Sequence, residues 1–432
     1  MGLLALDCPT QPYAWGKKGL DSSVAQIIQA QGKAVDEDLR FAELWCGTHV
    51  NGPAVVENAH GEKQPLLDFL KANPDVVSKD TVQQKECAED GLPYLFKILS
   101  VDTALSIQVH PDKARAAELH KERPEIYKDP NHKPEMACAI TPFEALAGFL
   151  PISTVLEHIL DTPELGALLD VSEEASDVIK SVQNVELLQS FSEEDEREAL
   201  KVLFSALMTS DPELVAEKVS ELKARIEATD GAAMPSTLAA RLADQYPGDV
   251  GVFCVYFMCY RALEPGQSVF LGANEPHAYL AGDCAEIMAC SDNVVRAGLT
   301  PKLRDTETLL STLTYRQPNH SGAEFHPGNL LAGEKRDSQS TVYSPPDPAV
   351  TEFQVERIVL KCDETYALHP SNYGSIMLVL EGEADSNTDQ DKEEQILKRG
   401  DIYFQPCGSE TTIVPTSSSG MILFRASKKG AF

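Results

Sequence analysis

The pattern of apolar and polar positions divides the chain into strand-like and helix-like stretches. From about Leu3 to Leu150, short apolar and β-branched runs alternate with Gly and Pro, which is typical of strands joined by loops. From 151 to 247 the apolar residues recur at helical spacing. Ser192-Glu-Glu-Asp precedes the apolar run Ala199–Met208 as a capping box does, and Asp211-Pro212-Glu213 predicts the start of another helix.

Strand patterns return after residue 250. The predicted strands are Gly251–Tyr260, Ser268–Leu271, Tyr279–Cys290, Ile376–Leu380, Ile402–Gln405 and Met421–Arg425. The polar stretch Gly333–Pro348 between them predicts a linker. Strands, then helices, then strands predict an α+β protein, mainly β, with a helical domain inserted between β segments. We therefore divide the chain into a β domain at 1–150 plus 248–332, an inserted helical domain at 151–247 and a C-terminal β domain at 333–432.

Composition narrows the classes of function. The chain has 432 residues with 37 Lys and Arg against 67 Asp and Glu, a formal net charge of -30, so its surface repels a phosphate backbone and nucleic-acid binding is not expected. No run of about 18 apolar residues occurs, so we expect no membrane span, and Met1–Thr10 lacks the basic start of a secretory signal. Ten cysteines without a C-x-x-C pair favour reduced thiols and a cytoplasmic location.

The segment Ser106–Lys113 offers candidate metal ligands. In a strand, alternate residues face opposite ways. One face would hold the apolar residues Leu105, Ile107 and Val109. The other face would hold Ser106, Gln108 and His110, which suits a solvent-exposed polar row but also allows Gln108 and His110 to direct an oxygen and a nitrogen at one ion.

Two further segments complete a possible ligand set. Lys133 and Glu135 share a face if the chain is extended, and a surface ion pair would explain them equally well. His277 follows a loop, where a single histidine is usually structural. Together Gln108, His110, Glu135 and His277 offer nitrogen and oxygen ligands without a thiolate, which suits Zn²⁺ with one open position. Ligand type alone would also admit Co²⁺ or Mn²⁺.

Positive charges near strands are unexpected in so acidic a chain. Arg296 and Lys302 lie close together around Gly298, and Lys97 ends an apolar run. A salt bridge would explain any one of them. A phosphate-bearing ligand would explain them together, because Arg binds phosphate with two hydrogen bonds and Lys acts as a point charge.

These motifs resemble a known family. The segments that match it, in the same order, are Gln11–Gly16, Ala42–Trp45, Leu95–Lys97, Ser106–Lys113, His132–Met136, Asn274–Tyr279 and Ser291–Lys302. They closely resemble the eukaryotic, zinc-dependent type I class of mannose-6-phosphate isomerases. The resemblance implies cupin-type β-barrels with an inserted helical domain. It also implies a degenerate C-terminal barrel without metal, because no histidine follows His369.

The resemblance also implies a reaction and a site. The reaction is the reversible conversion of mannose 6-phosphate and fructose 6-phosphate, which supplies mannose 6-phosphate for GDP-mannose and glycosylation in the cytoplasm. One zinc ion per chain would be bound by the four ligands above, and Arg296 would be catalytic. The other implied sugar-site residues are Trp15, Lys97, Ser106, Lys133, Tyr279, Glu286, Asp292 and Lys302. We expect a monomer whose partner is the small sugar phosphate.

The chemistry of the reaction assigns roles to these residues. Aldose–ketose conversion moves a proton between C1 and C2 through an enediol, and Arg296 would stabilise the developing oxygen charge. Glu286, Asp292 and Lys133 are candidates for the proton carrier, with Glu286 preferred because a carboxylate near a cation is ionised at neutral pH. An intramolecular hydride shift stays open. For the phosphate we expect Lys97 or Lys302, with a hydroxyl of Ser106 or Thr300.

Two other functions compete with this interpretation. A metal-cupin dioxygenase would use Fe²⁺ and usually more histidines, and a Gln ligand argues against it. A sugar-phosphate binding protein that has lost catalysis would lack a ligand or the arginine, and none is missing. Metal content, oxygen uptake and isomerase turnover distinguish the three functions.

Overall fold

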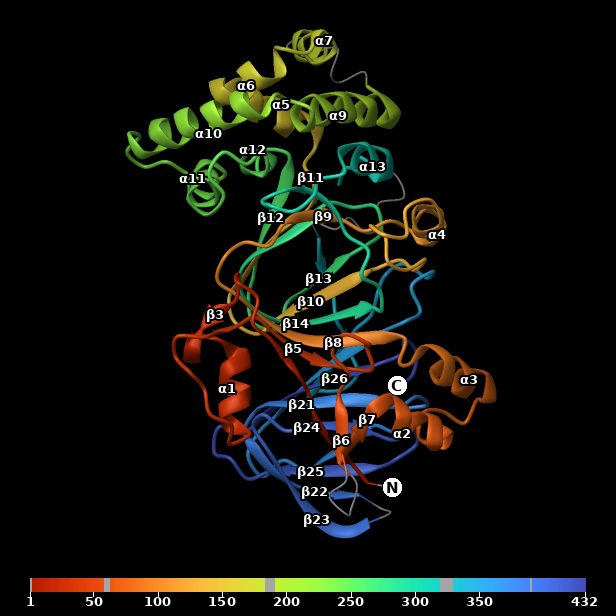
Figure 1. Cartoon of the computed structure of the whole chain (residues 1–432). Helices are drawn as coiled ribbons and strands as arrows, with labels where there is room; N and C mark the ends of the chain where they lie inside the picture. The colour runs from red at the N-terminus through yellow and green to blue at the C-terminus, as the bar shows by residue number, and fades with distance from the viewer. Residues whose placement is uncertain (1, 58–62, 183–190, 319–328, 389–390) are drawn as a thin grey trace.

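The computed structural model describes residues 2–57, 63–182, 191–318, 329–388 and 391–432. Two strand-rich regions follow each other along the molecule, and a layer of helices lies at the far end of one of them (Figure 1). We call these the central region, the C-terminal region and the helical domain. The predicted architecture, mainly β with an inserted helical domain, is confirmed.

The central region is one sheet of eleven strands. They are β2 (Thr10–Gln11), β5 (Glu43–Cys46), β8 (Tyr94–Val101), β9 (Ile107–Val109), β10 (Glu135–Ala139), β11 (Phe143–Phe149), β12 (Met258–Leu263), β13 (Ser268–Leu271), β14 (His277–Ala289), β15 (Val295–Gly298) and β16 (Leu330–Leu331). The long strand β14 pairs antiparallel with β8, β9, β10 and β11. It therefore brings together segments that lie far apart in the sequence.

The C-terminal region holds a sheet of nine strands and a sheet of four. The nine are β1 (Leu4–Asp7), β6 (Val55–Glu57), β7 (Lys63–Pro65), β17 (Glu334–Lys335), β18 (Ser340–Tyr343), β19 (Gln354–Leu360), β21 (Ser375–Glu381), β24 (Ile402–Gln405) and β26 (Met421–Ser427). The four are β20 (Tyr366–Leu368), β22 (Glu383–Thr388), β23 (Asp391–Lys398) and β25 (Thr411–Pro415), and a separate ribbon pairs β3 (Lys17–Lys18) with β4 (Arg40–Phe41).

This pairing departs from the sequence-based picture in two ways. The predicted linker at 333–348 contains the strands β17 and β18, so that prediction is wrong. A polar residue such as Ser340 can be buried in β18 because its hydroxyl donates a hydrogen bond to Glu356 (2.7 Å) on the neighbouring strand β19. In addition, β1 pairs with β24, and β6 and β7 follow it, so N-terminal strands complete the C-terminal sheet. The division into three domains stays a prediction, and these strand pairs cross its boundary.

The helical domain contains seven of the described helices. They are α5 (Ile152–Asp161), α6 (Pro163–Leu169), α7 (Glu173–Val182), α9 (Glu193–Met208), α10 (Pro212–Glu227), α11 (Ser236–Gln245) and α12 (Gly251–Cys254). The capping box at Ser192 is confirmed, since Ser192 and Asp195 exchange side-chain to backbone hydrogen bonds. Asp211 caps α10 as expected. None of the helices in the described part of the chain is long and apolar enough to cross a bilayer.

Two expectations about helices were wrong. The first 150 residues, expected to hold only strands and loops, also contain α1 (Ser23–Ala30), α2 (Leu66–Ala72), α3 (Thr81–Asp90) and α4 (Lys113–Glu122); α13 (Thr306–Thr312) follows the central strands. The segment expected as strand Gly251–Tyr260 begins with α12, and only Met258 onward is strand. Since residues 251–259 are all buried, no polar periodicity separates helix from strand there.

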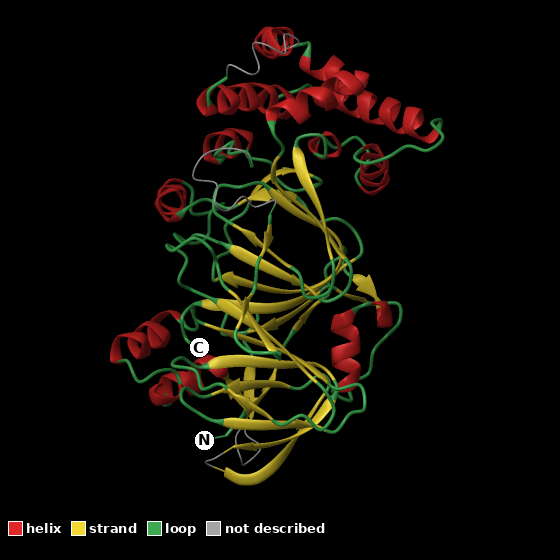
Figure 2. Ribbon diagram, turned by 180° about the vertical axis from the view of Figure 1, so that it is seen from behind, coloured by secondary structure: helices red, strands yellow, loops and turns green. Residues whose placement is uncertain are grey.

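Alternation along the central strands directs charged side chains inward. In β8, Phe96 and Ile98 belong to the core shared with the C-terminal sheet, whereas Leu99 belongs to a second cluster on the opposite face. Lys97, between them, therefore points to that opposite face. The same alternation holds in β10 and β14 and turns Glu135 and Glu286 to the same side. Figure 2 shows the strands of the two regions stacked in successive layers.

Candidate active site

Inside the central region is a cavity of about 670 Å³. Eleven of the thirteen residues predicted for the site line it: Trp15, Lys97, Ser106, Gln108, Lys133, Glu135, Tyr279, Glu286, Asp292, Arg296 and Lys302. The other two, His110 and His277, are fully buried and contact the lining residue Glu135. The structure thus brings the whole predicted set together.

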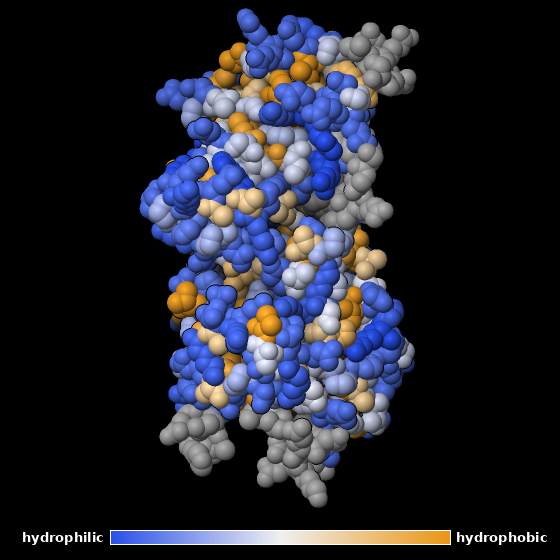
Figure 3. Space-filling model, turned by 90° about the vertical axis from the view of Figure 1, so that its right-hand side faces the viewer, coloured by the Kyte–Doolittle hydropathy of each residue, from blue (hydrophilic) through white to orange (hydrophobic). Residues whose placement is uncertain are grey.

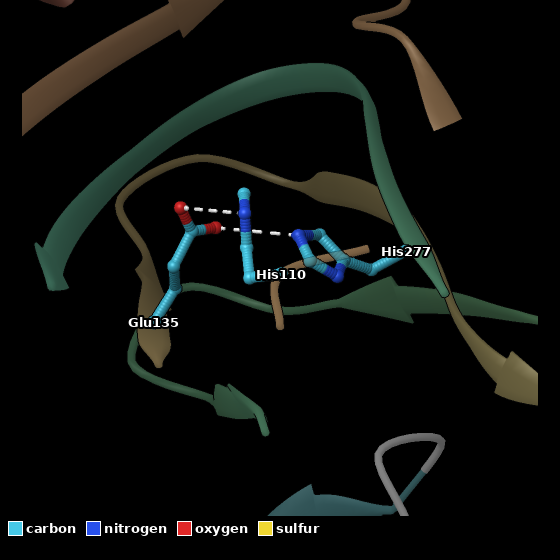
Figure 4. A group of neighbouring side chains, drawn as sticks. All are labelled: His110, Glu135 and His277. Carbon is cyan, nitrogen blue, oxygen red and sulfur yellow. Dashed lines mark ion pairs between the residues drawn. The ribbon is translucent and has the colours of Figure 1, made fainter. Parts of the chain in front are cut away.

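Three buried side chains converge at one point of this site (Figure 4). Nε2 of His110 lies 3.3 Å from one carboxylate oxygen of Glu135, and Nε2 of His277 lies 3.4 Å from the other. One potential ligand atom from each of the three lies within 4.8 Å of the others. The strands β9, β10 and β14 supply these residues at or next to their ends, so the sheet itself sets their spacing.

Backbone carbonyls determine which ring nitrogens face the centre. Nδ1 of His110 bonds the carbonyl of Asn293 (2.7 Å), and Nδ1 of His277 bonds that of Glu275 (3.1 Å). A carbonyl only accepts, so each Nδ1 carries the proton and each Nε2 presents a lone pair. Among the residues that the structure describes, neither Nε2 nor one oxygen of Glu135 finds a hydrogen-bond partner, although all three atoms are buried. Lone pairs that converge without a proton between them fit a metal cation.

The protonation states suit a cation as well. Burial, together with the nearby Lys133, lowers the pKa of His110 to about 4. Burial by itself would raise the pKa of Glu135, but the charge of Lys133 and the interaction with His110 hold it well below its usual range. At neutral pH the pair is therefore a neutral imidazole and a carboxylate, which are the forms that bind metal.

Gln108 lies beside this cluster through strand pairing. On β9 it is directly opposite His277 of β14 and Arg296 of β15, and it lines the cavity. The predicted alternation is confirmed for Ile107 and Val109, which are buried in the core of the helical domain. It fails for Leu105, which lines the cavity and packs on a different cluster because β9 begins only at residue 107.

A second buried charge cluster surrounds Lys97. Its Nζ lies 3.1 Å from Glu286 and 3.6 Å from Glu43, and 5.1 Å from the ring centre of Trp45. Burial would lower the pKa of Lys97, but Glu286 and Glu43 raise it, so the amine stays charged. Burial raises the pKa of Glu286 in spite of Lys97. Trp45 donates a hydrogen bond to Glu43 and so orients that carboxylate.

The remaining positive residues behave differently from Lys97. Lys133 is paired with Glu135 at 3.0 Å, as their shared face predicted. Arg296 is half-buried, which lowers the pKa of its guanidinium, and Lys302 is exposed. Neither Arg296 nor Lys302 forms an ion pair with any residue that the structure describes. The salt-bridge explanation therefore holds for Lys97 and Lys133 but not for the Arg296–Lys302 segment.

Sequence reasoning missed several residues at the mouth of the cavity. His49 lies 3.5 Å from Asp292, and Asn51 donates to the same carboxylate (3.2 Å). Glu43 and Trp45 lie in the segment Ala42–Trp45, which matches the family, but the sequence assigned them no role. Side chains two residues apart in a strand share a face, and this alternation along β5 was the signal that could have indicated the pair. His49 lies in a loop after β5, and nothing in the neighbouring sequence indicates that it meets Asp292, 243 positions later.

Comparison with known proteins identifies the family to which the chain belongs. The catalytic domain of type I phosphomannose isomerases matches residues 3–152, and the helical insertion domain of the same class matches residues 171–258. The mannose-6-phosphate isomerase of Cryptococcus neoformans is 41% identical over 437 residues, 96% of either chain. That of Bos taurus is 38% identical and covers 98% of this chain and 97% of its own.

Solved structures of phosphomannose isomerases have a fold similar to that of this chain. A variant of phosphomannose isomerase from Salmonella typhimurium superposes with a TM-score of 0.79 at 27% identity, over 99% of this chain and 100% of that one. A mannose 6-phosphate isomerase bound with zinc and yttrium has a TM-score of 0.78, 27% identity and the same coverage.

Proposed function

Because the chain belongs to the type I phosphomannose isomerases and interconverts mannose 6-phosphate and fructose 6-phosphate, we propose that the cavity described above is its active site and binds one zinc ion. The ligands are Gln108, His110, Glu135 and His277. The observation that supports this most directly is the set of buried lone pairs on the two histidines and Glu135, which have no hydrogen-bond partner.

This ligand set is suited to a catalytic ion. Three neutral ligands and one carboxylate leave a net positive charge, and a bound Zn²⁺ supplies Lewis-acid polarisation of substrate oxygens. Lys133 contacts the oxygen of Glu135 that also faces His110, and it keeps that carboxylate ionised. The carbonyls of Asn293 and Glu275 hold the imidazole rings in the tautomer that the ion requires.

The phosphate is best placed at the Arg296–Lys302 segment. Of the two candidate lysines, Lys97 is held between Glu286 and Glu43, whereas Lys302 has no ion pair among the described residues. Of these two lysines only Lys302 would offer a phosphate a free cation, with Ser106 and Thr300 lining the same cavity. The sugar carbons would then extend inward toward the cluster around Glu135.

Glu286 is the proposed proton carrier. It takes the proton from C2 of the aldose and returns it to C1, while carbonyl and hydroxyl exchange places through an enediol. Burial raises the pKa of this carboxyl, which makes its carboxylate a stronger base. Lys133 and Asp292 are the other candidates, but Lys133 is paired with Glu135, and Asp292 accepts from Asn51 at the mouth. Arg296 stabilises negative charge that develops on the substrate oxygens.

Turnover in D₂O separates proton transfer from a hydride shift. While the enediol is present, the proton on Glu286 exchanges with D₂O, so proton transfer introduces deuterium at the carbon that receives the proton. Glu286→Gln abolishes both turnover and exchange. Product without carbon-bound deuterium at every extent of reaction would contradict the proton-transfer proposal.

Chelation tests the metal proposal. Turnover lost on chelation should return with zinc, and His277→Ala should lower bound zinc and activity together. His158→Ala is a matched control because His158 also bonds a backbone carbonyl through Nδ1 (2.8 Å) but lies on α5 in the helical domain. Turnover that survives complete metal removal would contradict the ligand assignment. Oxygen uptake with iron, or substrate binding without turnover, would support the competing functions instead.

We further propose that the protein is a cytoplasmic monomer that supplies mannose 6-phosphate for GDP-mannose synthesis. All ten cysteines are free, which suits a reducing compartment. On the face shown in Figure 3, hydrophobic residues are scattered among hydrophilic ones, as on a monomer surface. Sedimentation equilibrium at micromolar concentration checks the oligomeric state, and a dimer mass would contradict it.

A further inference from the structure

The segment that joins α11 to α12, residues 245–251, reaches from the helical domain to the substrate cavity. We call it the α11–α12 connection. Tyr246 of this connection lines the cavity, and both helices lie on the side of the helical domain that faces the central region (Figure 1). Two loops that line the cavity meet the connection: residues 102–106, before β9, and residues 299–302, after β15.

Asp249 holds the second of these loops through its backbone. One carboxylate oxygen accepts from the N–H of Leu299 (2.7 Å) and of Gly251 (2.7 Å), and the other accepts from the N–H of Thr300 (3.1 Å). Leu299 has a φ of 54°, a left-handed conformation that is unfavourable for leucine. The hydrogen bonds from the loop to Asp249 compensate for this conformation, so the shape of the loop depends on a residue of the α11–α12 connection.

Two glycines bring the backbones of the connection and the loop into direct contact. A Cβ on Gly298 would lie 2.6 Å from Cα of Gly251, and a Cβ on Gly251 would lie 2.5 Å from the nitrogen of Leu299. No side chain fits at either position without a shift. The place of the loop is therefore set by main-chain contact, which varies less than contact between flexible side chains.

The same connection holds the first loop. Gln245 accepts from the N–H of Ala104 (3.1 Å), and the hydroxyl of Tyr246 donates to the carbonyl of Ala104. Ala104 lies two residues before Ser106, which lines the cavity. Seven consecutive residues thus hold both the Ser106 loop and the Lys302 loop.

We propose that the α11–α12 connection is a positioning element for the isomerase, in which Asp249 sets the place of Thr300 and Lys302 relative to Ser106. The helical insertion is then part of the substrate-binding machinery. The inference rests on the proposed phosphate site at these loops. Lys302 has no ion pair with a described residue that could hold it, so its position follows that of its backbone. Small misplacements of binding groups lower turnover strongly.

Asp249→Ala tests the inference. We expect kcat/KM for mannose 6-phosphate to fall roughly 10- to 100-fold, most of it through a higher KM. Asp249→Asn keeps an acceptor oxygen for Leu299 and Gly251 but places an amide opposite the N–H of Thr300. It should raise KM less than Asp249→Ala does. If the alanine variant does not fold, the KM of Asp249→Asn tests the inference.

Asp211→Ala is the matched control. Asp211 also accepts two backbone N–H groups, those of Glu213 (2.9 Å) and Leu214 (3.1 Å), in the same helical domain but away from the cavity. It should lower thermal stability and leave KM unchanged. If the Asp249 variants fold and keep the normal KM, the inference is overturned.

Two further readouts separate this inference from the proposed function. Amide hydrogen exchange at Leu299 and Thr300 in the substrate-free protein should accelerate in Asp249→Ala, whatever the roles of zinc and Lys302; unchanged exchange overturns the inference. Bound zinc should be the same in wild type and Asp249→Ala. If Lys302→Ala leaves KM unchanged, the phosphate assignment fails, and a raised KM in Asp249→Ala still supports positioning through Thr300.

Discussion

The central and C-terminal regions both bury charged side chains, but in different ways. In the C-terminal region, Arg425 and Glu356 are completely buried and paired (3.3 Å). Arg425 also donates to Ser375 (3.0 Å) and to the carbonyl of His369 (2.8 Å), and Ser340 donates to Glu356. In the central region, the nitrogens and oxygens of His110, Glu135 and His277 converge as lone pairs without protons between them.

The comparison shows that burial of charge does not by itself mark a site. Burial lowers the pKa of Arg425 to about 10, which leaves it charged at neutral pH and matched by Glu356. The charges of such a pair are matched within the protein and the pair acts structurally, and the buried atom it leaves without a hydrogen-bond partner among the described residues, Nη2 of Arg425, is a donor. Acceptors that face one another need a cation from outside the chain. The type of atom left without a partner, rather than the amount of buried charge, distinguishes the two regions.

Of the variants that test this difference between the two regions, Glu135→Gln should cause the largest loss of activity. It removes the only charged member of the proposed ligand set, so we expect a loss of bound zinc and roughly a 1,000-fold or greater fall in kcat/KM. Metal analysis and the isomerase assay check this, with thermal unfolding to verify the fold. Full zinc occupancy in the variant would contradict the proposal that Glu135 is a metal ligand.

Arg425→Met should affect stability and not activity. It removes the nearer arginine from the buried Glu356 and leaves only Ser340 and, at 3.8 Å, Arg336 beside it among the described residues, so the free energy of unfolding should fall by about 3–5 kcal/mol, while kcat/KM of the folded protein stays within about twofold. The double variant Arg425→Met with Glu356→Leu should recover much of that loss. Denaturant unfolding of both variants provides the measurement. A large loss of kcat/KM in folded protein would show that this pair also serves the reaction.

Lys302→Ala should raise KM for mannose 6-phosphate about tenfold, as expected for loss of one charged contact, and change kcat less. Lys302 is exposed, so stability should not change. Equal losses in kcat and kcat/KM would contradict a role in binding the phosphate. Lys335→Ala, an exposed lysine of the C-terminal region, is the control.

The smallest expected effect is on the pH dependence of stability, and it arises from a contact between the central and C-terminal regions. Glu352 accepts from Lys113 (2.8 Å) and approaches His132 (2.8 Å). Burial would raise its pKa, but these partners lower it to about 2, against an ordinary 4.5. A carboxyl with a lowered pKa stabilises the fold above pH 4.5, and the contribution disappears as pH falls toward 2. The difference in melting temperature between wild type and Glu352→Gln should therefore shrink over that window; a constant difference would contradict it.

Local patterns in the sequence determined much of the molecule. Ser192 with Asp195, and Asp211 with Pro212, mark helix starts through bonds within one turn, so neighbouring residues suffice to predict them. Strand alternation predicted the shared face of Lys133 and Glu135. Each of the segments with Gln108, His110, Glu135 and His277 had an ordinary structural explanation, but the four residues together offered a nitrogen and oxygen ligand set that suits a metal, and the resemblance to a family implied the same four.

Only the tertiary structure decided which residues meet. Both Lys97 and Lys302 were candidates for phosphate, and pairing of β8 with β5 and β14 enclosed one between Glu43 and Glu286 while leaving the other exposed. The meeting of His49 with Asp292, the pairing of β1 with β24, and the hold of Asp249 on Leu299 likewise join distant segments. Such contacts depend on sheet register and on the packing of whole domains. These are properties of the folded chain as a whole, and no local stretch of sequence specifies them.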